Sequence, residues 1–385
     1  MNRLNNAPWL REQAANACFA LYLTSSLLLR SFSSPWLGLG WTALAVGFWL
    51  APKKSIGPRP LFVFLVVLLL THAMAVLGSL VWGDGNWEST AGVVLWMAPA
   101  LLLYVAAGPV LLRWLIPVFV AHASWVIYQG LTSWHWVPDC LWVPGPVGSE
   151  YAGRCEPLET GLYVWGGAPT GLANNSNLAA GLLVLGMVYF LNRRDRLGGL
   201  AGVLMVTATL ATNSRWGIAV GLALLLAMVL SRRVPARVLG LIVGCLAGLF
   251  VLLALTTPVG FRIAGYNSLA GAVAPVSHDV LVRLQVPHIP SFLPRGVAEH
   301  PGLHNVPLRI AVENGIQAAA LWIGITLWAL WRWRNGTAWW MLLALVALSM
   351  LDYYTWMGHL GGFWWLLVGL LVKKAKDKKR WMDVE

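Results

Sequence analysis

Residues 193–233 read RRDRLGGLAGVLMVTATLATNSRWGIAVGLALLLAMVLSRR, and this stretch decides the fold class. It holds two apolar runs, 197–212 and 215–231, with basic residues at their far ends and the polar turn TNSR, residues 212–215, between them. A helix of about 20 apolar residues crosses the hydrocarbon core of a bilayer. The stretch therefore predicts two membrane-spanning helices whose basic ends share one side of the membrane and whose polar turn lies on the other.

The same pattern recurs along the whole chain. Of its 385 residues, 58% are hydrophobic and only 11% are charged, whereas a soluble domain carries about 25% charged residues. We therefore predict an all-α integral membrane protein, a single polytopic domain over residues 1–385 with about twelve transmembrane helices. The predicted spans are 14–31, 35–51, 60–82, 90–112, 114–131, 178–192, 197–212, 215–231, 237–257, 309–331, 337–351 and 355–372.

The net charge of +12 reports topology and not a nucleic-acid partner. Basic clusters fall between every second pair of apolar runs, as the positive-inside rule requires, so we expect both termini in the cytoplasm. The N-terminus lacks the small-residue cleavage site of a signal peptide, and its first apolar run reads as a span. The clusters are Arg3/Arg11, Lys53/Lys54/Arg59, Arg113, Arg193/Arg194/Arg196, Arg232/Arg233/Arg237, Arg332/Arg334 and Lys373 to Arg380.

Two predicted outward-facing segments are longer than a turn, 132–177 and 258–308. The second holds the arginines Arg262, Arg283 and Arg295 and the histidines His278, His288, His300 and His304. Positive charge on the outward side opposes the topological bias, and a negatively charged ligand outside the membrane is one reason for it. Cys140 and Cys155 share the first segment, where a local disulfide is open to either outcome.

Three polar motifs stand at outward helix starts. Residues 171–177 (GLANNSN) precede span six, TNSR opens span eight, and His304 with Asn305 precedes span ten, which has Pro307 in its first turn. The ordinary interpretation is capping, because Asn and Ser are preferred N-caps and Pro is tolerated in a first turn.

Arg215 and Glu313 invite a second interpretation. A cation in a first helical turn opposes the helix dipole, so Arg215 fits best if it holds an anion such as phosphate together with free backbone N–H groups. The alternative is an arginine that reaches to the lipid headgroups. Arg309 and Glu313 have the i,i+4 spacing of an ion pair, and an acidic residue close to a span is a functional candidate. His304 is either a loop histidine without a role or part of this group.

Motifs for metal and nucleotide binding are missing from the sequence. It has no HExxH, no CxxC, no outward-facing DxD, and no Walker or GxGxxG motif in a strand–helix context. We therefore expect no metal, no cofactor and no nucleotide chemistry.

Three segments resemble the O-antigen ligase family of bacterial membrane glycosyltransferases. His304-Asn305, nine residues and then Gly315 is similar to the family signature, although Ala318 stands where the family has Gly, Thr or Tyr. Asn213-Ser214-Arg215 looks like the family's Ser-Arg at a periplasmic helix start. The segment from Gly171 to Ala179 is similar to its Gly…Asn-x-Asn-x-Ala segment.

The resemblance implies a GT-C-like, metal-independent and inverting transferase in the bacterial inner membrane, with a periplasmic loop subdomain between spans nine and ten. It would move a glycan from undecaprenyl diphosphate to the core oligosaccharide of lipid A. Arg215 and a loop arginine, Arg283 first and Arg262 next, would bind the diphosphate, and His304 would act as general base or orient the acceptor. The residues expected to bind substrate besides Arg262 are Asn305, Arg309, Glu313, Asn174 and Asn177.

Other functions remain as alternatives. An O-antigen polymerase or a protein O-oligosaccharyltransferase would share the arginine and histidine logic. The first long loop contains only Arg154, which favours a ligase over a polymerase with two arginine-rich loops. A transporter for lipid-linked sugars would need ionisable residues near the middle of spans, and the sequence offers no convincing one.

Overall fold

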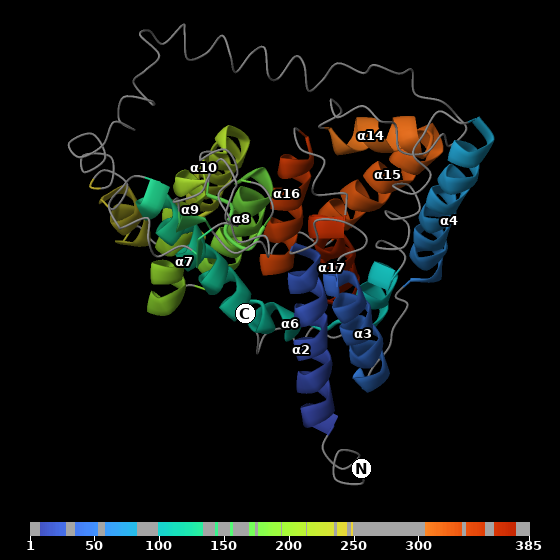
Figure 1. Ribbon diagram of the computed structural model, residues 1–385, viewed down its shortest axis with the longest axis horizontal. Coiled ribbons are helices and arrows are strands. Elements are labelled where there is room, and N and C mark those ends of the chain that lie inside the picture. Colours follow the sequence, from blue (N-terminus) through green and yellow to red (C-terminus); the bar gives the residue numbers. More distant parts are fainter. Residues whose placement is uncertain are drawn as a thin grey trace, which may run out of the picture. The chain divides into compact units, whose positions relative to one another are not determined.

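The computed structural model in Figure 1 describes most of the predicted helices. The described residues are 8–27, 35–52, 58–82, 99–133, 143–144, 155–156, 169–173, 176–193, 195–212, 214–234, 237–244, 248, 305–332, 336–350 and 358–374. Most of the predicted periplasmic loop 258–308 therefore lies outside the described residues.

The described residues are almost entirely α-helical, which confirms the predicted fold class at this level. The helices are α2 (Pro8–Leu27), α3 (Pro35–Leu50), α4 (Arg59–Trp82), α6 (Leu111–Trp114), α7 (Ile116–Ser133), α8 (Ser176–Asn192), α9 (Arg196–Ala211), α10 (Arg215–Leu230), α14 (Val306–Glu313), α15 (Ile316–Arg332), α16 (Thr337–Ser349) and α17 (Gly358–Lys374). Residues 99–106 and 237–244 are also helical. The short strands β1 (Val143–Pro144) and β2 (Cys155–Glu156) pair antiparallel within the predicted loop 132–177.

The number of clear spans is smaller than the twelve that the sequence predicts. Among the described residues, two helical stretches, Arg59–Val81 and Leu111–Leu131, are long and apolar enough to cross a membrane. Six further apolar helices are shorter, with at most 17 residues. At 1.5 Å per residue they reach about 20–26 Å, which is short of the roughly 30 Å hydrocarbon core. Parts of the predicted spans, among them residues 90–98 and 249–257, lie outside the described residues.

Two predicted spans are interrupted. The span predicted at 90–112 is helical over 99–106, but the helix stops before Gly108 and Pro109, because proline lacks an N–H and restricts the residue before it. The span predicted at 309–331 is divided between α14 and α15 by Asn314 and Gly315. Gly315 has φ +92°, a conformation that glycine adopts without steric cost.

The chain forms two compact units, residues 1–118 with 284–385, and residues 119–283. In the first unit α2 packs against α3 and α17, α15 contacts α4, α14 and α17, and α16 contacts α17. The largest fully buried side chains of this unit are aromatic, namely Trp364, Trp365, Tyr22, Tyr104, Phe19 and Phe363. Gly369 allows close contact, because a Cβ there would lie 2.9 Å from the backbone of Tyr104.

The second unit is built around α8. Every residue of α8 from Leu178 to Leu191 is buried, because α9 and α10 pack against it (Figure 1). Phe119 of α7 packs against Tyr189 and Phe190 near the C-terminal end of α8. The ring centroid of Phe119 lies 6.2 Å from that of Tyr189 and 6.3 Å from that of Phe190. A helix that is apolar on all sides is typical of a buried position.

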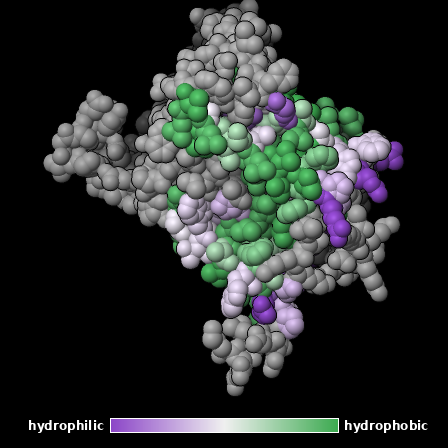
Figure 2. All heavy atoms as spheres, turned by 90° about the vertical axis from the view of Figure 1, so that its right-hand side faces the viewer, coloured by the Kyte–Doolittle hydropathy of each residue, from purple (hydrophilic) through white to green (hydrophobic). Residues whose placement is uncertain are grey.

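Helix α4 exposes a long apolar face. Only 33% of the most apolar 18-residue stretch of this helix is buried. Figure 2, which views the side where α4 lies in Figure 1, shows apolar side chains gathered there. The exposed apolar residues of α4 are Val63, Phe64, Val67, Leu70, Met74, Leu77, Leu80 and Val81. An exposed face made of these eight apolar residues suits contact with lipid better than contact with water.

Candidate functional site

The first turns of α8 and α10 are joined by a side-chain hydrogen bond. Ser214 Oγ donates to Asn177 Oδ1 at 2.8 Å and accepts from the backbone N–H of Gly217 at 3.2 Å. The backbone N–H of Ser214 in turn donates to Thr212 Oγ1 at 3.2 Å. Ser214 is thus the N-cap of α10, as the sequence predicts. The same bonds bring Asn177 of α8 to the start of α10.

A glycine lets the two helices approach each other at this end. A Cβ at Gly217 would lie 2.3 Å from the Cβ of Ala180, so the position admits no larger residue without a shift of the backbone. Gly221, one turn later, faces Val184 at ordinary contact distance. The spacing Gly217-x-x-x-Gly221 is the small-residue pattern of close helix packing in membranes. This contact therefore has a signal in the sequence, the two glycines four residues apart.

Arg215 is the first residue of α10, directly after the N-cap. This is the position that the sequence predicts, although the Arg215 side chain lies outside the described residues, as do Asn174 and Asn213. The N-termini of α8 and α10 both carry backbone N–H groups without helical acceptors. Helix N-termini carry the positive end of the helix dipole, which favours an anion over a cation.

The loop before α8 is held by two side chains of α7. Gln129 Oε1 accepts from the backbone N–H groups of Thr170 and Gly171 at 2.9 and 2.7 Å. His122 Nδ1 accepts from the N–H of Leu172 at 3.0 Å. His122 and Gln129 are both fully buried. We refer to these two side chains as the α7 clamp.

In the first unit, Asn305 fixes the start of α14. Its Oδ1 accepts from the N–H of Leu308 at 3.0 Å, and its Nδ2 donates to the carbonyl of Met350 at 2.7 Å. Asn305 is therefore both the N-cap of α14 and a tie to the residue that ends α16. Both polar atoms have a protein partner, so the geometry gives Asn305 a positioning role beside the substrate-binding role expected from the sequence.

Arg309 and Glu313 form the ion pair that their spacing predicts. Arg309 Nε donates to Glu313 Oε1 at 2.7 Å. Their side chains are only 8% and 5% exposed, so the pair is buried within its unit and does not face solvent. A buried pair of this kind holds its segment in one arrangement, because either charge alone is costly to bury.

Several predicted site residues fall outside the described part of the chain. These are His304, Arg283, Arg262 and Asn174, together with Cys140 and the side chain of Cys155. Their roles and the Cys140–Cys155 disulfide stay predictions. Asn177 and Arg215 belong to the second unit, whereas Asn305, Arg309 and Glu313 belong to the first.

Two histidines inside helices correct one expectation from the sequence. His72 lies in the middle of α4 and His122 in the middle of α7, and both are buried. Ionisable residues near the middle of predicted spans therefore exist. The signal was available, because a histidine within an apolar run is a functional candidate by default.

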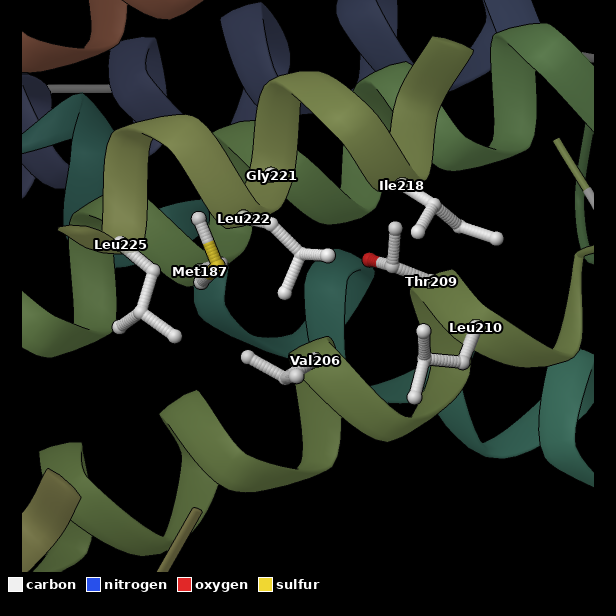
Figure 3. Close-up of a pocket in the computed structure, with 8 residues that line it drawn as sticks. All are labelled: Met187, Val206, Thr209, Leu210, Ile218, Gly221, Leu222 and Leu225. Atoms are coloured by element: carbon white, nitrogen blue, oxygen red, sulfur yellow. The ribbon is translucent and has the colours of Figure 1, made fainter. Parts of the chain in front are cut away.

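An apolar hollow lies between α9 and α10 (Figure 3). It is a small hollow that opens to the surface and has room for about one water molecule, and it includes Ile218, which is three residues after Arg215. Its lining residues are Met187, Val206, Thr209, Leu210, Ile218, Gly221, Leu222 and Leu225. Apart from the hydroxyl of Thr209 this lining is hydrocarbon-like.

Comparison with known proteins does not assign the chain to a family. No family model matches the chain, and no curated protein matches it.

Proposed function

We propose that the chain is a membrane glycosyltransferase of the O-antigen ligase type. It transfers a glycan from undecaprenyl diphosphate to the core oligosaccharide of lipid A, at the periplasmic face of the bacterial inner membrane. The proposal includes a GT-C-like arrangement of about twelve spans, with the short apolar helices counted among them. The observation that carries it is the Ser214–Asn177 bond, which joins two helix N-termini at the position of Arg215.

Charge stabilisation is the chemistry that this arrangement supports. The leaving group of the donor is a diphosphate, and negative charge develops on it as the bond to the sugar breaks. Backbone N–H groups at helix N-termini and a planar guanidinium are suitable partners for phosphate oxygens. Such preorganised donors do the work of a metal ion. Arg283 is the first choice for a second arginine, and Arg262 the next.

The acceptor side of the reaction centres on His304. A neutral imidazole accepts a proton from an attacking hydroxyl group. In the proposed step the acceptor hydroxyl oxygen attacks the anomeric carbon and loses its proton to His304. The bond from that carbon to the diphosphate breaks, the electron pair leaves with the diphosphate, and the configuration inverts. The cap at Asn305 and the buried Arg309–Glu313 pair support the chain directly after His304.

The donor also needs an apolar surface for its lipid chain. The hollow in Figure 3 includes Ile218, close in sequence to Arg215. A polar head bound at the N-terminus of α10 and a hydrocarbon chain along α9 and α10 match the two chemistries of a lipid diphosphate.

Contacts within each unit support the proposed topology. Lys373 Nζ donates to the carbonyls of Val105 and Ala107, both at 2.9 Å, and Trp114 Nε1 donates to Gln13 Oε1 at 2.8 Å. The proposed topology puts all of these groups at cytoplasmic ends. The bonds Asn305–Met350 and Ser214–Asn177 join residues that it puts at outward ends.

The test is transfer by the purified protein in lipid nanodiscs, with undecaprenyl diphosphate-linked glycan as donor and with lipopolysaccharide core, carrier-linked glycan and protein as separate acceptors. We expect glycan on the core, undiminished by EDTA. Longer carrier-linked chains would make the protein a polymerase, and glycosylated protein would make it an oligosaccharyltransferase. If no donor is consumed while liposomes carrying the protein move the lipid-linked sugar across the bilayer, the protein is a transporter and the proposal is wrong.

A further inference from the structure

We propose that Gln129 and His122, the α7 clamp, are positioning residues that set the affinity of the anion site at the N-termini of α8 and α10. The inference rests on the proposed function for the identity of the ligand, a lipid diphosphate. The clamp itself consists of contacts within the second unit, and both of its residues lie outside the three polar motifs at helix starts.

Gln129 holds two consecutive backbone groups with one oxygen. The N–H groups of Thr170 and Gly171 both point to its Oε1, at 2.9 and 2.7 Å. Thr170 and Gly171 are buried, so water does not replace a lost partner easily, and a buried donor without an acceptor is costly. An apolar residue at position 129 would release both groups at once.

His122 extends the clamp from the loop into α8. Its Nδ1 accepts from the N–H of Leu172 at 3.0 Å, and its Nε2 faces the carbonyl of Ala179 at 3.2 Å. These two bonds assign the neutral tautomer with the proton on Nε2, because one nitrogen must accept and the other must donate. Ala179 is two residues after Asn177 in the first turn of α8. His122 therefore fixes the start of α8 as well as the loop that leads to it.

Gly171 is the residue that lets the loop reach the clamp. Its φ of +60° lies in the left-handed region, which favours glycine. A Cβ at this position would lie 2.5 Å from Nδ1 and Cε1 of His122. The glycine that begins the 171–177 motif thus has a structural explanation, close contact with the imidazole of α7.

The contacts form a continuous path to Arg215. The clamp holds residues 170–172 and Ala179, Asn177 lies between these two points and accepts from Ser214, and Ser214 caps α10 directly before Arg215. Releasing the clamp would let the first turn of α8 shift, and with it the cap of α10. A misplacement of about 1 Å at a site of this kind costs up to about a hundredfold in rate or affinity.

The experiment compares two variants. Gln129→Met removes the acceptor oxygen, whereas Gln129→Glu keeps an acceptor oxygen at the same place. We expect Gln129→Met to raise the donor KM about tenfold and to lower kcat as well, because the loosened groups bind the diphosphate and stabilise its charge as the bond to the sugar breaks. Gln129→Glu should restore the KM to within about twofold. Hydrogen exchange should rise at residues 170–172 in the Met variant only. If Gln129→Met does not fold, the pair His122→Leu and His122→Gln carries the same comparison.

Thr326→Val is the matched control. It removes a buried hydrogen bond of the first unit, in which Trp364 Nε1 donates to Thr326 Oγ1 at 3.0 Å. It should lower the melting temperature and leave the donor KM unchanged. An equal rise of KM in Thr326→Val and Gln129→Met would overturn the inference, because general destabilisation would then explain both.

Direct binding of undecaprenyl diphosphate to the protein in nanodiscs separates this inference from the proposed function. Wild-type protein that transfers glycan, with a Gln129→Met variant of unchanged KM, overturns the inference and leaves the function standing. Wild-type protein that transfers no glycan but binds the carrier about tenfold more tightly than Gln129→Met supports the inference and overturns the function. Wild-type protein that neither transfers glycan nor binds the carrier overturns both.

Discussion

Two arginines in the second unit occupy the same position in a helix and differ in the side of the membrane that the proposed topology gives them. Arg215 follows the N-cap Ser214 of α10, and Arg196 follows the N-cap Asp195 of α9. We expect Arg215→Ala to lower kcat/KM for the donor by about a hundredfold or more, because a charge-assisted contact to the leaving diphosphate is lost. Arg196→Ala, the matched control, should change it by less than about twofold. Similar losses in both variants would argue against an anion role for Arg215.

The Arg309–Glu313 pair makes a residue-scale prediction about stability. Both side chains are buried and joined at 2.7 Å, so removing either partner leaves a charge without compensation. Arg309→Met or Glu313→Leu alone should lower the free energy of unfolding by about 3–5 kcal/mol. The double variant should lose less than either single variant, since no charge remains buried. Unfolding of the purified protein in detergent measures this, and additive losses would contradict the prediction.

At the scale of elements, the contact between α8 and α10 depends on Gly217. Gly217→Ala would place its Cβ against Ala180 and should destabilise the protein by about 1–3 kcal/mol. Ala180→Gly in the same chain should recover much of this loss. Gly240→Ala is the control, because a Cβ at this helical glycine has nothing within 4 Å. The measurement is the melting temperature of the wild type, the two single variants and the double variant. An equal drop in melting temperature for Gly217→Ala and Gly240→Ala would contradict the prediction.

The start of α9 carries a pH-dependent cap. Burial raises the pKa of Asp195, whereas the hydrogen bond from Gly198 N and the neighbouring Arg193 lower it. The lowering effects are together the larger, so the pKa lies below its ordinary value. A lowered folded-state pKa means that the stabilisation is present above the unfolded pKa of about 3.9 and is lost as the pH falls through the folded value. Asp195→Ala should cost about 1 kcal/mol at pH 7. The difference from wild type should narrow toward pH 3 in unfolding measurements, and a constant difference would contradict the cap.

Helices were predictable from the sequence, whereas their interruptions were less so. Apolar runs between basic clusters gave boundaries close to those of α8, α9 and α10, and the caps at Ser214 and Asn305 followed from residue preferences. The break at Gly315 could not be inferred from hydropathy, because a glycine within an apolar run is tolerated in many helices. Contacts between segments distant in sequence, such as Gln129 with Gly171, depend on packing that no local pattern reports.

For the whole molecule, the proposed orientation in the membrane joins the separate observations. The proposed anion site, Gln129 of the α7 clamp and the cap at Asn305 lie at or next to segments that the basic clusters predict to be on the outward side. If the orientation were inverted, Arg215 would face the cytoplasm and the donor could not be a glycan already exported to the periplasm. The topology is therefore the assumption on which the proposed function depends most.

Cysteine labelling tests this assumption directly. In a cysteine-free background, Tyr151→Cys and His278→Cys should react with a membrane-impermeant maleimide in intact spheroplasts, because both positions fall in the predicted outward loops. Lys54→Cys and Lys376→Cys, within basic clusters, should react only after permeabilisation, since Lys and Arg concentrate in cytoplasmic loops. A blot of labelled protein, with total cysteine determined after denaturation, gives the fraction that reacted. Labelling of the Lys54 or Lys376 variants in intact spheroplasts would place the basic clusters outside, and the proposed periplasmic transfer would then be impossible for this chain.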